Sequence, residues 1–291
     1  MAASPTFKIS DAVRDVLARS TITATSVKLP DEQLERKLYE AVNKALEGAG
    51  GKWNRSKKVH VFERDPREIL GLAVETGKAT NVRTALQAFY TPDALADRVV
   101  AATGIANDPV VVKARSGKPA GRPVTLEPSI GEGAIALALV RATGGHVAID
   151  ACDIDPVAIG KARHKVAAAY LAAGHRDTGL MRVYEMDFLK GSVREAIRYD
   201  YIVMNPPFAK GADIKHVTHA FAMLDDGGVL AAIMWPRWRE ADTAAAKAFR
   251  ELYASANGSC EDIAAGTFEH TDMPTVLVVL RKPAPPEEDE S

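Results

Sequence analysis

The chain has 291 residues and two cysteines, 47% of its residues are hydrophobic, and its formal net charge is −1. It is long enough for one large core, or for one domain with an accessory segment, and it has neither a disulfide framework nor the roughly 18 consecutive apolar residues of a membrane span. Because residues 1–9 also lack an apolar signal core, the sequence excludes secreted and membrane-spanning classes and predicts a cytoplasmic protein.

Residues 1–80 predict an accessory segment made of a helical arm, a helix and a hairpin. The arm, residues 7–19, carries apolar side chains that either pack on their own domain or pair with a second copy of the chain. An amphipathic helix is predicted over residues 31–46, and the alternating residues 58–62 predict the second strand of a hairpin.

The hairpin is rich in basic side chains, and phosphate contacts in nucleic-acid complexes come mostly from such residues. Its candidate DNA-binding residues are Lys52, Arg55, Lys57 and Lys58. Trp53 lies among them and is interpreted as a residue that packs on the preceding helix rather than a wedge that stacks on a base.

A helix is predicted from residue 92 to about residue 102, with Thr91 as its N-cap and Pro92 as its first residue. Phe89 and Tyr90 precede the cap, and a hydrophobic staple explains only one of them. The following residues 114–123 form a Gly- and Pro-rich loop. Its basic side chains are either phosphate contacts or a solvated insertion, and they are Arg115, Lys118 and Arg122.

Three apolar strands follow, and each ends in residues suited to binding a ligand. Residues 124–126 lead into Glu127-Pro128-Ser129-Ile130-Gly131-Glu132-Gly133, where Gly131 and Gly133 allow a tight turn before a helix over residues 134–142. Residues 146–152 lead into Asp153-Ile154-Asp155-Pro156, about 20 positions after the turn, where an acid is placed to bind ribose hydroxyls. Residues 181–186 lead into Asp187-Phe188. Plain helix capping is the alternative for both acids.

A fourth strand, residues 199–204, ends in Asn205-Pro206-Pro207-Phe208. The two prolines stop the strand, so Asn205 lies at its carboxyl end, where open α/β sheets bind ligands. An Asn oxygen and a rigid neighbouring carbonyl suit an exocyclic amino group, and Phe208 suits the ring that carries it. A simple strand-ending turn is the alternative.

The remaining chain completes an α/β sheet. Helices are predicted over residues 213–224 and 239–256, and strands over residues 229–234, 261–264 and 275–281. Phe268 precedes the last strand.

An acidic tail, residues 283–291, is predicted to be disordered. Without its four acidic residues the rest of the chain has a net charge of +3, which is compatible with a nucleic-acid partner.

The ordered motifs resemble those of S-adenosylmethionine-dependent DNA adenine-N6 methyltransferases of the gamma group, particularly compact phage-type and orphan bacterial enzymes. The resemblance covers about residues 80–282 and rests on residues 89–92, 126–133, 153–156, 187–188 and 205–208. It implies a Rossmann-like class I methyltransferase domain over residues 81–282, with a seven-stranded, mostly parallel sheet. The implied cofactor is S-adenosylmethionine, and no metal is expected.

The resemblance also assigns roles to individual residues. Asn205, Pro206, Pro207 and Phe208 would hold the target base, with the Pro206 carbonyl as second acceptor. Asp153 would bind the cofactor ribose, Ile154 its adenine face, and Asp187 and Phe188 its adenine edge and ring. Tyr90 and Thr91 would approach the methionine end of the cofactor, and Glu127, Ser129 and Gly131 would line it. The other cofactor-binding candidates are Phe89, Pro92, Pro128 and Gly133.

The expected activity is therefore methylation of adenine N6 in double-stranded DNA after the base has been flipped out. Methylation of guanine N2 in RNA or of a protein glutamine is the first alternative, because Asn-Pro-Pro-aromatic motifs are shared with such enzymes. The second is a DNA-binding regulator that acts through the methyl mark. Restriction-modification and epigenetic control are both compatible roles.

The resemblance also bears on how the DNA sequence would be recognised. Phe268 would face the flipped base, and a place in the core is the alternative. Many related enzymes have a separate target-recognition domain, and we expect none within this length. Recognition then falls to residues 1–80, to the loops or to a second subunit, and we expect a homodimer on a palindromic site.

Overall fold

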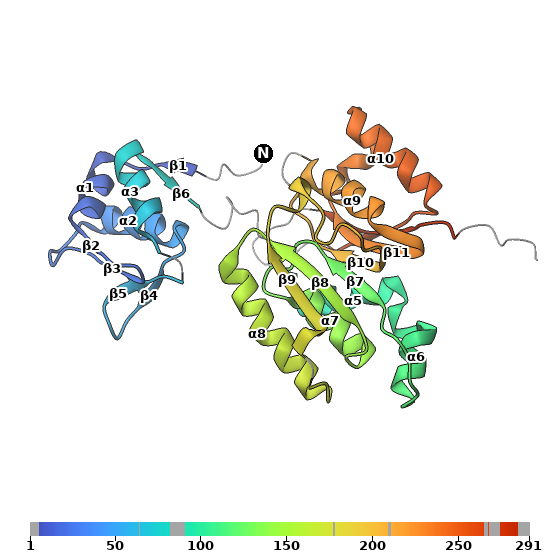
Figure 1. The fold of residues 1–291 in the computed structure, drawn as a ribbon. Coiled ribbons are helices and arrows are strands. Elements are labelled where there is room, and N and C mark those ends of the chain that lie inside the picture. Colours follow the sequence, from blue (N-terminus) through green and yellow to red (C-terminus); the bar gives the residue numbers. More distant parts are fainter. Residues whose placement is uncertain are drawn as a thin grey trace, which may run out of the picture. The chain divides into compact units, whose positions relative to one another are not determined.

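The computed structural model describes residues 6–63, 65–81, 91–176, 178–208, 211–264, 267 and 274–284. The chain divides into two compact units, Met1–Ala88 (unit 1) and Phe89–Ser291 (unit 2), which are described separately (Figure 1). The sequence-based boundary was placed at residue 80. Among the described residues, none of the helices combines the length and apolar character that a bilayer crossing requires.

Unit 1 is an α+β unit with two small antiparallel sheets. Its strands are β1 (Thr6–Lys8), β2 (Thr21–Ile22), β3 (Ser26–Lys28), β4 (Lys52–Asn54), β5 (Val59–Val61) and β6 (Lys78–Thr80). Its helices are α1 (Asp11–Arg19), α2 (Arg36–Gly48) and α3 (Arg67–Thr76). β1 pairs with β6, and the other strands are ordered β2-β3-β5-β4. The predicted helix and hairpin are present as α2 and as β4–β5.

The apolar arm of the sequence belongs to the core of unit 1. Ser10 caps α1 by accepting a hydrogen bond from the Val13 backbone, and Val13, Val16 and Leu17 are at most 1% exposed. They pack in one cluster with the apolar face of α2 and with Leu70 of α3. The arm therefore packs on its own unit, which was one of the two alternatives, and these three side chains are not available to a second copy.

Unit 2 contains the predicted sheet. Its strands are β7 (Val124–Glu127), β8 (Ala148–Asp153), β9 (Met181–Glu185), β10 (Tyr199–Met204), β11 (Leu224–Met234), β12 (Ser259–Ile263) and β13 (Thr275–Arg281). In the described part of the unit these seven strands form one sheet, in the order β12-β13-β11-β10-β7-β8-β9. Only β13 runs against its neighbours, because β11 and β12 both pair with it antiparallel and the other pairs are parallel. This confirms the Rossmann-like class I methyltransferase fold.

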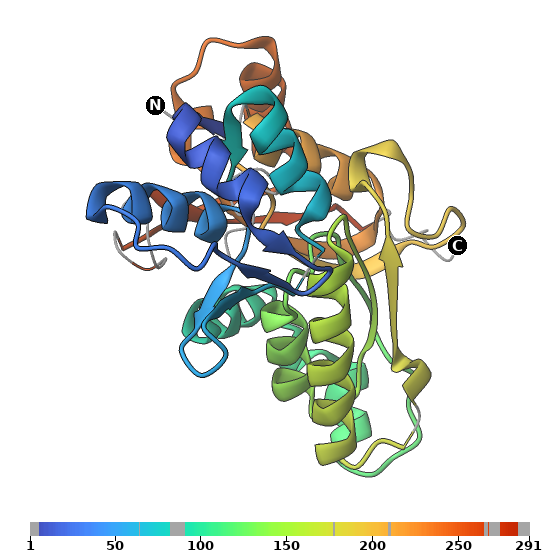
Figure 2. The same ribbon diagram turned by 90° about the vertical axis from the view of Figure 1, so that its left-hand side faces the viewer.

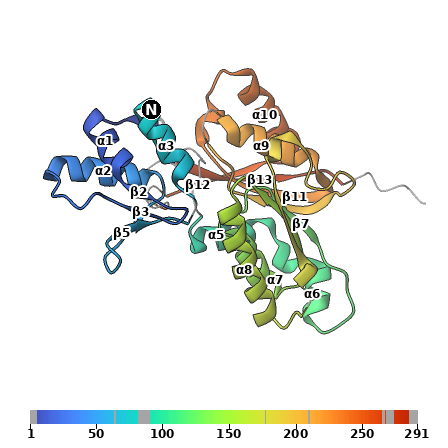
Figure 3. The same cartoon turned by 60° about the vertical axis from the view of Figure 1, so that its left-hand side comes forward.

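Helices cover both faces of this sheet. The main ones are α5 (Asp93–Thr103), α7 (Ala134–Thr143), α8 (Pro156–Ala172), α9 (Ala212–Ala222) and α10 (Ala244–Ser255), and a short α6 (Pro109–Arg115) follows α5. Figure 3 shows α5, α7 and α8 on one face and α9 and α10 on the other. Each face has its own core, one containing Leu139 and Ile149 and the other Met204 and Phe249. Burial on both faces explains why the central strands read as continuous apolar runs.

Short 3-10 helices complete the unit. They are η1 (Ile105–Asn107), η2 (Thr178–Leu180), η3 (Phe188–Lys190) and η5 (Pro236–Arg239). The helix predicted over residues 239–256 begins later than expected, because η5 ends at Arg239 and α10 starts at Ala244. Thr243 caps α10 by accepting a hydrogen bond from the Ala246 backbone, so the helix begins after it.

Candidate active site

The site lies where the strand order of unit 2 reverses. The chain runs from β7 outward to β8 and β9, and then returns to place β10 on the other side of β7. In open α/β sheets ligands bind in the crevice outside the carboxyl ends of strands at such a point. Glu127 ends β7, and Asn205 directly follows β10. The two motifs that the sequence singled out at these strand ends are therefore neighbours in the fold.

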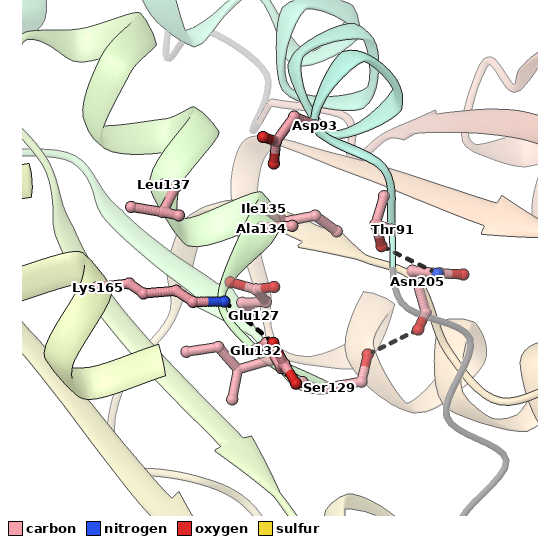
Figure 4. A pocket seen from close by; sticks show the side chains of 12 residues that line it. Thr91, Asp93, Glu127, Ser129, Glu132, Ala134, Ile135, Leu137, Lys165 and Asn205 are labelled. Atoms are coloured by element: carbon pink, nitrogen blue, oxygen red, sulfur yellow. Dashed lines mark hydrogen bonds and ion pairs between the residues drawn. The ribbon is translucent and has the colours of Figure 1, made fainter. Parts of the chain in front are cut away.

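A cavity of about 160 Å³ opens at this position (Figure 4). Its walls come from the glycine loop after β7, the first turns of α5 and α7, and the end of β10. Five of the predicted site residues line the cavity, and they are Thr91, Glu127, Ser129, Gly131 and Asn205. Ligand pockets usually measure about 300–1,000 Å³, so this cavity accommodates one part of an extended ligand.

Asn205 is held in place by two hydrogen bonds from different segments. Its side-chain Nδ2 donates to Thr91 Oγ1 at 3.0 Å, and its backbone carbonyl accepts from Ser129 Oγ at 3.1 Å (Figure 4). The side chain is 9% exposed. The bond to Thr91 orients the carboxamide and the bond from Ser129 holds the backbone. A side chain that recognises an amino group of a ligand must be held in this way.

Thr91 corrects the sequence-based assignment. The sequence predicts Thr91 as the N-cap of α5. The N-cap position is occupied by Pro92 instead, and among the described residues no side chain caps the helix there. The hydroxyl of Thr91 instead accepts the hydrogen bond from Asn205. Pro92 is half-buried beside it. Phe89 and Tyr90 lie outside the described residues.

Glu127 is a buried carboxylate beside the cavity. The side chain is 1% exposed, and its Oε2 has no hydrogen-bond partner in the described part of the chain. Burial, and secondly the charge of Asp153, raise the pKa of Glu127 well above its ordinary value. A buried carboxylate with an unsatisfied oxygen is costly unless a ligand satisfies it, and a cationic ammonium group matches it in charge and in hydrogen bonding.

The glycine loop is shaped by Asp153 and by its own backbone. Gly131 and Gly133 have φ values of +50° and +89°, which favour glycine. A Cβ atom at Gly133 would lie 3.1 Å from the Ala162 side chain of α8, so the second glycine also permits close packing of α7 and α8. Asp153 Oδ2 accepts from the Gly131 backbone at 2.8 Å, and Oδ1 accepts from the Asp155 backbone at 3.0 Å.

The other two strand ends place their polar residues along the same edge. Ile154 is 52% exposed, which is unusual for a large apolar side chain that follows a buried strand. Asp155 caps α8 by accepting from the Val157 backbone. Asp187 caps η3 through the Leu189 backbone, and it also pairs with Lys190 at 3.3 Å. Capping was the alternative for Asp153 and Asp187. It describes part of what Asp187 does, whereas the cap of α8 is Asp155 and not Asp153.

Two aromatic candidates are buried. Phe188 is 3% exposed and packs between His216 and His219 of α9, with ring centroids 5.9 and 4.8 Å away. Phe208 is also 3% exposed and belongs to the core cluster under α5 and α7. In this structure neither ring lies open to a planar ligand. Pro206 is buried and Pro207 half-buried, and Pro128 is buried beside the glycine loop, where its carbonyl accepts from Cys152 Sγ.

Sequence reasoning missed one ion-pair network at the rim of the cavity. Glu132 of the glycine loop pairs with Lys161 and Lys165 of α8, each at 3.0 Å. These pairs lower the pKa of Glu132 despite its partial burial. The i and i+4 spacing of the two lysines was the available signal, because it places both on one helix face.

The candidate DNA-binding residues are divided between the two units. Lys52, Arg55, Lys57 and Lys58 belong to unit 1. Arg115, Lys118 and Arg122 lie before β7 and therefore at the amino ends of the parallel strands, opposite the cavity. Arg122 precedes Glu127 by five strand-like residues, or about 16 Å. Phe268 lies outside the described residues.

Part of unit 2 is similar to a known protein family. The family model described as "Methyltransferase small domain" matches residues 125–259, which include the glycine loop and Asn205. A search of curated proteins gave no match. The residues matched by the family model, 125–259, run from β7 to the start of β12.

Solved structures with the same fold include two subunits of restriction enzymes. The type I restriction-modification methyltransferase subunit from Streptococcus thermophilus has 19% identity and a TM-score of 0.53 over 73% of this chain and 49% of that chain. A modification subunit assigned to a type I restriction enzyme from Vibrio vulnificus has 16% identity and a TM-score of 0.50, covering 86% and 53%. An rRNA methylase from Streptococcus thermophilus has 15% identity and a TM-score of 0.38, covering 56% and 87%. The chain thus spans about half the length of the two restriction subunits.

The family match and the fold support an S-adenosylmethionine-dependent methyltransferase. S-adenosylmethionine is the cofactor that they imply, and the residues at the site fit it. It carries an ammonium group, which suits the unsatisfied Oε2 of Glu127. Its ribose and adenine suit the carboxylate of Asp153 and the exposed side chain of Ile154. The reactive sulfonium methyl group supplies the chemistry, so this chain needs to position a nucleophile beside it.

Proposed function

We propose that this chain transfers the methyl group of S-adenosylmethionine to the N6 amino group of adenine in double-stranded DNA. The observation that carries the proposal is the placement of Asn205. It follows β10 at the switch point, it lines the cavity beside Glu127, and Thr91 fixes its side chain. The motif Asn205-Pro206-Pro207-Phe208 supplies the residue types that an exocyclic amino group requires.

The chemistry of the amino group explains why such acceptors are needed. The N6 nitrogen of adenine is a weak nucleophile because its lone pair is delocalised into the ring. Acceptors on Asn205 and the Pro206 carbonyl would bind its two hydrogens and draw them out of the ring plane, which returns electron density to nitrogen. Such positioned acceptors stabilise the transition state more than the ground state.

Phe208 requires a conformational step under this proposal. Its ring is 3% exposed, so stacking on the target base needs the Phe208 ring to leave the core. Contacts between the flipped base and its pocket must then offset this cost together with the cost of unstacking the base from the duplex. Asn205 and Pro206, in contrast, are held at the strand end.

The restriction subunits favour DNA as the substrate. Both are described as parts of type I restriction systems, and they share the fold of this chain at low identity. Methylation of an RNA guanine or of a protein glutamine uses the same class of amino acceptor and remains the alternative substrate. A DNA-binding regulator would act through the same methyl mark, and a homodimer on a palindromic site is the assembly that we propose.

Sequencing that detects modified bases tests the substrate directly. DNA from a host that expresses the chain should carry N6-methyladenine in one short motif, and DNA from a host that expresses Asn205→Ala should not. Unmodified DNA together with methylated RNA from the same cells would replace DNA by RNA as the substrate.

A further inference from the structure

A groove on the surface of unit 1 combines aromatic, apolar and basic side chains. It lies between the segment after β3, helix α2 and the β4–β5 hairpin, and it has a volume of about 530 Å³. Its main lining side chains are Leu29, Leu34, Tyr39, Trp53, Lys57 and Lys58. All of them come from unit 1, so the groove is complete without unit 2.

Trp53 is the largest exposed aromatic side chain of the groove. It is 47% exposed, and Tyr39 is 38% exposed. This corrects the sequence-based interpretation of Trp53 as a packing residue for α2. Exposed aromatic rings that share one groove are unusual in a soluble unit and mark interaction surfaces.

The ring of Trp53 is supported from behind. Its centroid lies 5.1 Å from the ring of His60, the two rings being tilted by 56°. His60 is fully buried, and its Nε2 is 2.7 Å from Asn43 Oδ1 of α2. The support fixes one side of the indole while the other side remains open, so little conformational entropy is lost when a flat partner stacks on it.

The hairpin itself has a defined shape. Asn54 Oδ1 accepts from the Lys57 backbone at 3.0 Å within the turn, and Lys58 has φ of 53°. At the base of the hairpin, a Cβ atom on Gly51 would lie 2.7 Å from the Phe62 ring. In Figures 1 and 2 the tip of the hairpin extends away from α1 and α3.

Among the residues that the structure describes, the acidic side chains of the groove are paired, whereas two of its lysines are not. Its acidic residues already have partners, because Asp31 pairs with Lys28 and Glu32 pairs with Arg19, each at 2.8 Å. Lys57 and Lys58 form no ion pair in the described part of the chain. The groove therefore presents two unpaired ammonium groups next to two exposed rings.

We infer that this groove binds a single strand of DNA, with one base stacked on Trp53 and the adjacent phosphates on Lys57 and Lys58. Proteins that hold unpaired strands combine aromatic platforms with basic rims in this way. A duplex would use the lysines but leave the rings and the apolar floor without partners, since its base faces are stacked internally. The choice of DNA over RNA rests on the proposed function, and the inference goes beyond that function because it does not depend on which base unit 2 methylates.

Fluorescence anisotropy of a labelled 12-nucleotide oligothymidylate with the full chain tests this inference. The strand contains no adenine, so it does not engage the proposed methylation site. Trp53→Ala should weaken binding about tenfold or more, and Trp53→Phe should restore most of it, because stacking on an aromatic ring is retained. Lys57→Gln with Lys58→Gln should reduce the slope of log affinity against log salt by about 1.4, or 0.7 for each lost phosphate contact.

Matched controls separate these effects from general surface changes. Leu72→Ala removes another apolar side chain of unit 1 that is 50% exposed, and Lys78→Gln removes an exposed lysine on β6. Both should bind oligothymidylate like the unaltered chain. Circular dichroism verifies that each variant folds. If Trp53→Ala fails to fold, a fluorescence titration replaces it: the oligonucleotide should quench the Trp fluorescence of the unaltered chain, and this quenching should be lost in Trp53→Phe.

The inference is overturned if the Trp53 and lysine variants bind the strand with unchanged affinity and salt slope. It is also overturned if a duplex of equal length binds more tightly with the same dependence on Trp53, or if oligouridylate does so, because the surface then belongs to duplex DNA or to RNA. Duplex methylation measured on the same preparations reports independently on the proposed function.

Discussion

Asn205 donates a hydrogen bond from its side-chain Nδ2 to Thr91 Oγ1 at 3.0 Å, across 114 positions of sequence. The contact joins the segment before α5 to the end of β10, and both residues line the same cavity. It makes Thr91 a positioning residue for the carboxamide rather than a helix cap. The hydrogen bond joins two motifs of which the sequence shows only the order along the chain.

Thr91→Val should therefore slow methylation about fivefold to tenfold. The substitution keeps the side-chain shape but removes the acceptor, and a buried donor left without its partner costs about 1–3 kcal/mol. The affinity for S-adenosylmethionine, measured by calorimetry, should change little, and Thr91→Ser should keep most of the rate.

A double-mutant cycle decides whether Thr91 acts through Asn205. In the Asn205→Ala background, Thr91→Val should have almost no further effect, because the interaction is already absent. If the two losses are additive, Thr91 acts on something other than the carboxamide.

Asn205→Ala should reduce methylation at least about 100-fold, comparable to loss of one transition-state hydrogen-bond partner. Cofactor affinity should stay close to that of the unaltered chain, because Asn205 is assigned to the acceptor base. Asn107→Ala, which alters an exposed residue of η1, is the matched control. Abolished cofactor binding in a calorimetric titration of Asn205→Ala would show that the residue has been misassigned.

The sequence predicts the sheet well because its strands are buried on both faces. β10 and β13 have the predicted ends, Tyr199–Met204 and Thr275–Arg281, and prolines or glycines delimit the others. β11 begins five residues earlier than expected, at Leu224, because Tyr199 of β10 pairs there before a register shift. Such pairing depends on the neighbouring strand and leaves no local signal.

The side-chain environment was harder to predict than the backbone. Composition indicates that residues 113–122 are basic, but only the strand order places them at the edge opposite the cavity. Likewise, Trp53 and His60 are partners on neighbouring strands, and their rings are in contact. His60 takes the buried position and Trp53 stays exposed, which the sequence around Trp53 does not indicate. Glu127 could be predicted at a strand end, whereas its unsatisfied oxygen depends on all surrounding segments.

Glu127→Gln should weaken cofactor binding about tenfold or more while making the free protein more stable at neutral pH. The binding loss reflects removal of the charge that faces the ammonium group, since hydrogen bonds to charged groups are worth about 1.5–3 kcal/mol. The gain in stability reflects the cost of burying that charge without a ligand. Calorimetry and thermal unfolding measure the two effects.

The stability effect has a defined pH dependence. Burial raises the pKa of Glu127 in the folded chain above its ordinary 4.5, so between the two values the folded state binds more protons than the unfolded state. Stability of the unaltered chain then falls as pH rises from 4.5 through the raised pKa. The variant lacks this loss, so the difference in Tm should grow with pH. Glu251→Gln on the exposed face of α10 should show no such trend, and an equal trend in both would remove Glu127 as its cause.

Asp153→Ala should act mainly on the cofactor. The residue is assigned to the ribose, and its two oxygens also accept from the Gly131 and Asp155 backbones. We expect the Kd for S-adenosylmethionine to rise about tenfold or more, and the rate at saturating cofactor to stay within a fewfold. A rate that collapses at saturation with unchanged Kd would contradict this assignment.

The working unit should be a homodimer on DNA. Specific complexes bury about 1,000–2,500 Å² of protein surface. Within unit 2, the candidate DNA-binding residues Arg115, Lys118 and Arg122 precede β7, at the edge of the sheet opposite the cavity. A second copy would supply the missing contact surface and match a palindromic site. Light scattering with and without target DNA measures the state, and a monomer that methylates fully in both conditions would exclude the dimer.

Nucleoside mass spectrometry after incubation in vitro tests the central claim most directly. Purified chain, S-adenosylmethionine carrying a heavy methyl group, and unmodified duplex DNA should yield heavy N6-methyladenine, and Asn205→Ala should yield at most about 1% of that amount. Parallel incubations replace the DNA with RNA or with protein. Heavy label that is absent from the DNA but present in guanine of the RNA or in glutamine of the protein would contradict the account.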